Sequence, residues 1–223
     1  MGIKTLLARE MERLKQRFLF LGGRVEKSLS MAVQSVRDRD RDLAREVIEK
    51  DAEIDDLEVE LEEECLKILA LHQPVAVDLR MIVAILKINN DLERVGDLAA
   101  NIAEHAIFLA DKPPLGFPFD FDQMADRTQE MLRKALDSLV NESGATAQEV
   151  READDLVDRL HERTYGAVEA LIRDRPEHIE CAINFIGLSR RLERVADMAT
   201  NIAEDVIYLV EGEIVRHGAQ IPD

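Results

Sequence analysis

Residues 92–109 read LERVGDLAANIAEHAIFL, and residues 192–209, one hundred positions later, read LERVADMATNIAEDVIYL. Twelve of the eighteen positions are identical. In both stretches apolar residues recur at three- and four-residue spacing, which is typical of an amphipathic α-helix with one buried face. The pair indicates an internal duplication. Its period is too long for a solenoid repeat and suits a duplicated small domain.

The rest of the chain follows the same helical pattern. Helices are predicted over about 4–37, 42–72, 75–110, 120–142, 146–174 and 177–211. Pro74 and Pro176 each mark a break, because proline has no N–H to donate and restricts the residue before it. We therefore expect an all-α protein of two tandem, pseudo-symmetric three-helix bundles, residues 1–110 and 120–223, joined by the Pro-rich linker 111–119.

Composition narrows the classes of function. The formal net charge is −17 over 223 residues, and so acidic a surface repels phosphate backbones, which argues against nucleic-acid binding. The N-terminal sequence lacks the apolar stretch of a secretory signal, and no apolar run approaches the roughly 18 residues of a spanning helix. The sequence thus predicts a cytoplasmic protein.

A stripe of polar residues lies roughly opposite the apolar face of each repeated helix. It comprises Glu93, Asp97, Asn101 and Glu104 in the first copy, and Glu193, Asp197, Asn201 and Glu204 in the second. Two further acidic pairs precede the prolines: Asp51 and Asp55, and Asp154 and Asp158. If the helices on either side of Pro74 pack antiparallel, Asp55 comes level with Glu93, since both stand nineteen residues from that proline. The second half matches within about one residue.

Carboxylates brought level on neighbouring helices repel one another, at on the order of 1 kcal/mol per pair at 4 Å in water. They can point into solvent, take up protons or bind cations. Oxygen ligands suit hard cations such as Mg²⁺, Ca²⁺, Mn²⁺ or Fe³⁺, whereas structural Zn²⁺ favours Cys and His. His161 could reach the same face but is expected to face solvent. Ser138 and Ser189 are expected to have no neighbouring His, so we predict no catalytic nucleophile and no enzyme.

Taken together, the QPVAVDLR stretch at 73–80, the two E-x-x-x-D helices with their LERV and NIAE flanks, and the two D-x-x-[IV]-D pairs resemble the PhoU family. The resemblance covers essentially the whole chain. It implies a cytoplasmic, homodimeric accessory and regulatory protein of bacterial phosphate uptake. The implied partners are the ATPase subunit of the Pst transporter and the PhoR sensor kinase, with membrane association only through those partners. The implied role is negative regulation of the phosphate-starvation response.

The resemblance also implies multinuclear metal clusters on the E-x-x-x-D carboxylates. Carried onto this chain, the first cluster would use Asp51, Asp55, Glu93 and Asp97, and the second Asp154, Asp158, Glu193 and Asp197. Additional ligands would be Asn101, Asn201, Glu104 and Glu204, one or two turns further on. Iron, manganese or magnesium fits these oxygen donors better than zinc does. Two alternatives stay open: a di-iron-type carboxylate metalloenzyme, and a metal-free helical scaffold whose acidic stripe docks basic partners.

Overall fold

The computed structural model describes residues 2–212, and these contain helices and no strand. The helices are α1 (Gly2–Asp38), α2 (Arg41–Glu49), α3 (Asp51–His72), α4 (Ala76–Ala110), α5 (Phe121–Val140), α6 (Gly144–Asp174), the 3₁₀ turn η1 (Pro176–His178) and α7 (Ile179–Glu211). The all-α prediction is confirmed. The outermost residues of the predicted bundles, 1 and 213–223, lie outside the described residues.

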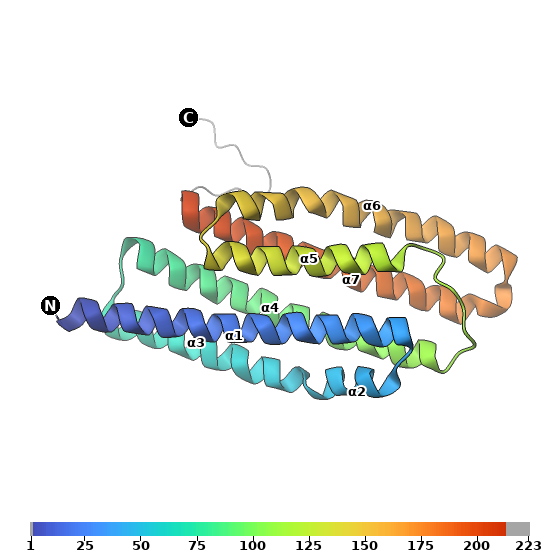
Figure 1. Cartoon of the computed structure of the whole chain (residues 1–223), viewed down its shortest axis with the longest axis horizontal. Coiled ribbons are helices and arrows are strands. Elements are labelled where there is room, and N and C mark those ends of the chain that lie inside the picture. The colour runs from blue at the N-terminus through green and yellow to red at the C-terminus, as the bar shows by residue number, and fades with distance from the viewer. Residues whose placement is uncertain (1, 213–223) are drawn as a thin grey trace.

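Helices α1–α4 form one bundle and α5–α7 a second, stacked beside it (Figure 1). In this view α1 and α5 lie nearest the reader, and α4 and α7 pack against each other behind them. The repeated stretches supply much of the core. Their predicted apolar face is buried along its whole length in both copies, from Leu92 to Leu109 and from Leu192 to Leu209. The prediction of two tandem helical bundles is therefore confirmed.

The single helix predicted over 42–72 was wrong, because the structure divides it into α2 and α3 at Lys50. Lys50 has φ −89° and ψ −2°, and a ψ near zero departs from the α-helical value of about −42°. The Glu53 N–H then bonds the Lys50 carbonyl at 3.1 Å, an i→i+3 contact that tightens the chain locally. The break makes Asp51 the first residue of α3, where the helix dipole favours a carboxylate.

The two bundles meet where α4 packs against α7, and this interface shows the same pseudo-symmetry as the two halves of the chain. Lys87 of α4 forms an ion pair with the buried Asp205 of α7, with 3.2 Å between Nζ and Oδ1. One hundred residues on, Lys87 corresponds to Gly187, and His105 corresponds to Asp205. The His105 ring lies over Gly187, where a Cβ atom would stand 2.7 Å from its Cε1. The same two helix positions thus meet twice, once as an ion pair and once as a ring against a glycine.

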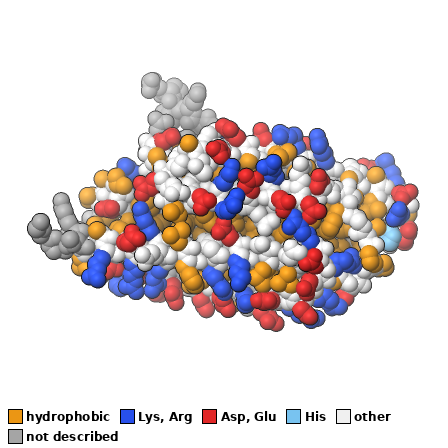
Figure 2. All heavy atoms as spheres, viewed as in Figure 1, with side chains coloured by type: hydrophobic (Ala, Val, Ile, Leu, Met, Phe, Trp, Pro, Cys, Tyr) orange, Lys and Arg blue, Asp and Glu red, His pale blue; other side chains and the backbone are white. Residues whose placement is uncertain are grey.

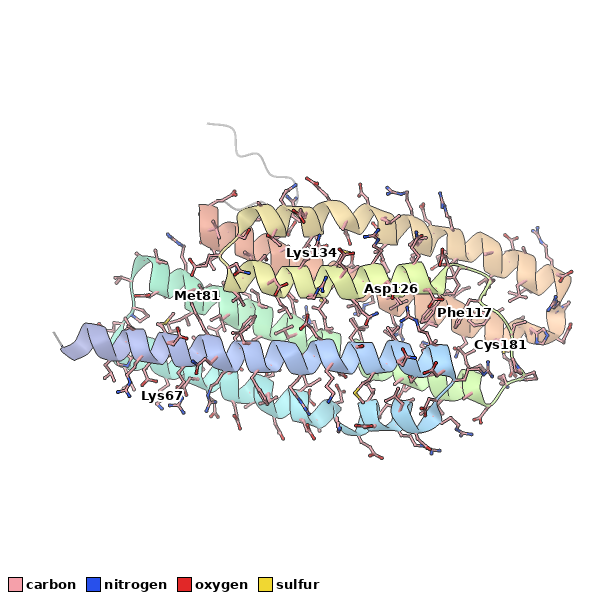
Figure 3. The ribbon with its side chains drawn as sticks, viewed as in Figure 1. Lys67, Met81, Phe117, Asp126, Lys134 and Cys181 are labelled. Carbon is pink, nitrogen blue, oxygen red and sulfur yellow. The ribbon has the colours of Figure 1, made fainter. Side chains whose placement is uncertain are left out.

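One further contact joins the bundles, and the linker packs on the second of them. Arg37 of α1 binds two carboxylates of α5, with its Nε 2.7 Å from Asp122 and its Nη2 2.6 Å from Asp126. The segment between α4 and α5 folds onto the start of α7: Phe117 stacks on Phe121 at 4.6 Å between ring centroids and lies 5.2 Å from the buried Phe185. Figure 3 labels Asp126 on α5 and Phe117 on this segment.

Acidic and basic side chains are interspersed over the face formed by α1 and α5 (Figure 2). Many of them form ion pairs, such as Lys134 with Glu149 at 3.0 Å. Within residues 2–212, no helix is long and apolar enough to cross a membrane.

Candidate metal centre

Helix α3 divides its acidic side chains between two neighbouring helices. Glu60 pairs with Arg17 of α1 at 3.4 Å, and Glu53 pairs with Arg24 of the same helix. The carboxylates on the other side of α3 have no such partner and lie against acidic residues of α4. This first carboxylate group comprises Asp51, Asp55, Glu93 and Asp97. It occupies the seam of α3 and α4, and no basic residue of α1 is among the charges that act on Asp51 or Glu93.

Burial and mutual repulsion raise pKa values within the first group. The pKa of Asp51 is raised to about 6, first by burial and then by Asp55, Asp97 and Glu93. Burial, Asp97 and Asp55 likewise raise the pKa of Glu93, against a smaller opposing effect of Arg94. The Oδ1 atom of Asp51 is buried and has no hydrogen-bond partner among residues 2–212. A cation would satisfy that oxygen and relieve the repulsion.

The second carboxylate group lies at the matching seam of α6 and α7. It comprises Asp154, Asp158, Glu193 and Asp197. Oxygens of the three aspartates all lie within 4.8 Å of one another. The pKa values of Asp154 and Asp197 are each raised to about 6, chiefly by burial and then by neighbouring carboxylates of the group. As in the first group, one oxygen, Asp154 Oδ1, is buried and has no hydrogen-bond partner among the described residues, although the nearby Thr200 hydroxyl lowers the pKa of Asp154.

The structure thus brings together the eight central candidates in two groups, at the levels that their distances from Pro74 and Pro176 predict. The stripe does not face solvent squarely, because Asp51, Glu93, Asp154, Glu193 and Asp197 are half-buried between helices. Asp55, Asp97 and Asp158 form the exposed rim. The oxygen donors of both groups suit hard metal ions. Among the described residues only the second group brings three ligand atoms within 4.8 Å of one another, whereas the carboxylates of the first group are linked by their mutual repulsion.

The four outer candidates stand apart from these groups. Glu104 is exposed, seven residues beyond Asp97 and so about 10 Å further along α4. Glu204 faces Arg151 of α6, at 3.5 Å between Oε1 and Nε. The Asn101 amide donates to the Asp97 carbonyl at 2.6 Å, and the Asn201 amide lies 4.0 Å from a methionine sulfur. Their role as ligands stays a prediction.

His161 is where the sequence-based expectation was wrong. It is half-buried, and its Nδ1 lies 2.5 Å from Ser189 Oγ, so Ser189 does have a neighbouring histidine. Burial and Arg190 lower the pKa of His161, while Asp158 opposes them. Ser189 is fully buried, so its hydroxyl is not open to a substrate and the pair joins α6 to α7. In the first half Asn89 and Glu58 form the matching contact, which the sequence reasoning also missed.

Comparison of the two halves could have revealed this pair. If α3 is aligned with α6 at an offset of 103 residues, Asp51 falls on Asp154 and Glu58 falls on His161. If α4 is aligned with α7 at an offset of 100, Asn89 falls on Ser189. The exchange of a carboxylate–amide pair for an imidazole–hydroxyl pair is therefore present in the sequence, one turn away from the acidic motifs.

Comparison with known proteins identifies the same two repeats. A family model described as the PhoU domain matches residues 19–106 and again residues 121–206. A relative from Aquifex aeolicus, named a phosphate-specific transport system accessory protein PhoU homolog, is 39% identical over 211 residues, which is 95% of this chain and 96% of that one. The crystal structure of PhoU from Pseudomonas aeruginosa superposes with a TM-score of 0.88 at 38% identity, covering 92% and 99% of the two chains. A phosphate transport system regulatory protein PhoU from Streptococcus pneumoniae gives 0.87 at 29% identity, covering 94% and 99%.

Proposed function

The chain belongs to the PhoU family, and on that premise we propose that it is a non-catalytic regulator of bacterial phosphate uptake and homeostasis. In this role it joins the ATPase subunit of the Pst transporter to the PhoR sensor kinase and restrains the phosphate-starvation response. The chain aligns over most of its length with accessory proteins of phosphate transport, at 39% identity, and this similarity supports the regulatory role. An elongated pair of bundles with separate helical faces suits a protein that meets two partners, and a homodimer would double those faces.

We propose further that each carboxylate group holds metal ions. The observation that carries this proposal is the pair of buried oxygens without a hydrogen-bond partner among the described residues, Asp51 Oδ1 and Asp154 Oδ1, one in each group. Iron, manganese or magnesium ions bridging several carboxylates would neutralise each seam. Bound cations would turn two repulsive acidic patches into ordered surfaces that a partner or an anion can recognise.

The position of the groups favours regulation over catalysis. Di-iron carboxylate enzymes hold their ligands inside a helical bundle, with Glu-x-x-His motifs on the ligand helices. Here the groups lie at outer seams, and the inward faces of α4 and α7 are apolar over the repeated stretches except for Asp205, which pairs with Lys87. The metal-free docking scaffold differs from the regulator proposed here in one measurable property, which is whether partner binding depends on metal.

The test of this function measures partner binding and signalling together. The protein, with metal and after chelation, is tested for binding to purified transporter ATPase subunit and sensor kinase. A strain that lacks its own PhoU-family protein and carries a phosphate-starvation reporter is then complemented with the wild type and with D51N/D55N/D154N/D158N. We expect the wild type to bind both partners and to lower reporter output in high phosphate, and the variant to lose that repression. Wild-type protein that binds neither partner and leaves the reporter unchanged would overturn the proposal.

A further inference from the structure

The two carboxylate groups share the same four residue types, but the residues beside them differ. The difference lies at the level one helical turn beyond each group, toward the turn that joins its two helices. In the first half this level is formed by Glu58 of α3 and Asn89 of α4, whose amide nitrogen is 2.7 Å from Glu58 Oε1. In the second half it is formed by His161 of α6 and Ser189 of α7, at 2.5 Å. The two levels occupy equivalent positions in the duplicated fold, so the same place beside each acidic group carries a carboxylate in one half and an imidazole in the other.

Each of these side chains keeps one ligand atom available beside its acidic group. Glu58 accepts the Asn89 amide on Oε1 and keeps Oε2, and the negative charges of Glu93 and Asp55 act on it at close range. When His161 donates its Nδ1 proton to Ser189, its Nε2 lone pair is left free, which is the arrangement that metal-bound histidines usually have.

His161 stands three residues after Asp158, on the same side of α6. The rise between them is about 4.5 Å along the helix axis, and the negative charge of Asp158 acts on the imidazole. The imidazole therefore stands beside Asp158 at the edge of the group, outside the cluster of oxygens that Asp154, Asp158 and Asp197 form. Contact with Ser189 on one side and the edge of Tyr165, 5.2 Å between ring centroids, on the other restricts the orientation of the ring.

We propose that this exchange gives the two sites different metal preferences. The first site, with Glu58 at its edge, offers only oxygen donors and prefers a hard cation such as Mn²⁺. The second site adds the His161 imidazole and prefers a borderline cation such as Zn²⁺. This inference rests on the proposed function, because it presupposes that both groups bind metal. It assigns His161 as a specificity-determining residue of the second site and Glu58 as its counterpart in the first.

The experiment isolates each site within the full chain. E93A/D97A removes two ligands of the first group and leaves the second intact, and E193A/D197A does the reverse. Zn²⁺ and Mn²⁺ affinities are measured by calorimetric titration of chelator-treated protein. In the E93A/D97A background we expect H161Q to weaken Zn²⁺ about 10- to 100-fold and to change Mn²⁺ less than about 3-fold. The exposed E162Q, on the neighbouring position of α6, should change neither.

The reciprocal variant tests the other half of the proposal. In the E193A/D197A background E58H should raise the Zn²⁺ affinity of the first site about 10-fold. A second measurement does not depend on any substitution at 161: the ring ¹⁵N resonances of His161 in E93A/D97A should shift as Zn²⁺ is added, and the Nε2 signal should move most. An H161Q variant with an unchanged Zn²⁺-to-Mn²⁺ preference, or a His161 ring that does not respond to bound Zn²⁺, would overturn the inference while metal binding itself stands. If the unmodified chain binds neither ion, the proposed metal sites fail instead.

Discussion

Replacement of Asp154 by Asn should stabilise the metal-free protein at neutral pH. In the folded chain the pKa of Asp154 is raised from 3.8 to about 6, by burial and by Asp158 and Asp197, against an opposing effect of the Thr200 hydroxyl. At about 1.4 kcal/mol per pKa unit, a shift of this size corresponds to about 3 kcal/mol of unfavourable interaction when the carboxylate is ionised. Asp154 is only half-buried, so solvent screening reduces the expected gain in the free energy of unfolding to about 1 kcal/mol at pH 7.

The pH dependence has a definite sign. A carboxyl whose pKa is higher in the folded state binds more protons there than in the unfolded chain between about pH 4 and pH 6, so the stability of the wild type falls as the pH rises through that window. Below about pH 4 Asp154 is protonated in both states, and the advantage of Asp154→Asn should disappear. Urea unfolding followed by circular dichroism in a chelating buffer, at pH 4 and pH 7.5, measures both ends.

Bound metal should reverse this order of stability, so that the wild type becomes more stable than Asp154→Asn. A cation bound to the folded state stabilises it by about 2.7 kcal/mol at a concentration one hundred times its Kd, and the Asn variant loses much of this because it lacks one ligand. Glu162→Gln, with the same change of charge at an exposed site of α6, should show neither effect. If Asp154→Asn destabilised the metal-free protein at pH 7.5, the carboxylate would be making favourable contacts, and repulsion within the second group would be refuted.

Three further predictions concern the packing that positions the two seams, and each is read from urea unfolding. Gly187→Ala should destabilise the chain by about 1 kcal/mol, because its Cβ would stand 2.7 Å from the His105 ring, whereas Gly166→Ala, with open space around it, should stabilise it by up to about 1 kcal/mol; equal effects would contradict the close contact between α4 and α7. Phe185→Ala should cost about 3–5 kcal/mol because the ring is buried under the linker aromatics, and a loss below about 1 kcal/mol would contradict that packing. Arg37→Ala should cost about 1 kcal/mol, and less in high salt, since its two ion pairs are partly exposed; a loss that does not change with salt would argue against ion pairing.

The fold could be predicted from the sequence because its strongest signals are long and repeated. The apolar face that runs from Leu92 to Leu109 recurs at 192–209, and this face is buried in both copies. Pro74 and Pro176 fix where two hairpins turn, so counting residues outward from them places Asp55 level with Glu93. An error of one residue in such a count shifts a side chain by about 1.5 Å along the helix, which long carboxylate side chains absorb.

The features that the sequence did not reveal depend on local geometry without a composition signal. The break at Lys50 lies in a stretch with neither Gly nor Pro, and only its dihedral angles and an i→i+3 hydrogen bond mark it. The contact of His161 with Ser189 needs the rotation of α6 about its own axis, which the periodicity of α6 does not define closely enough. A single histidine on a charged helix also matches no sequence motif. Only the alignment of α6 with α3 shows that His161 stands at the position of Glu58.

The most direct test of the two carboxylate groups as metal sites is elemental analysis of untagged protein purified without chelator. Plasma mass spectrometry of the wild type should find more than one hard or borderline metal ion per chain. The E93A/D97A variant should keep its helical circular dichroism spectrum and lose only the ions of the first bundle. Unchanged stoichiometry in that variant would contradict the ligand assignment. A wild-type chain that is purified without metal and takes up none from added iron, manganese or magnesium would contradict the central proposal and leave the duplicated acidic seams as surfaces for protein docking.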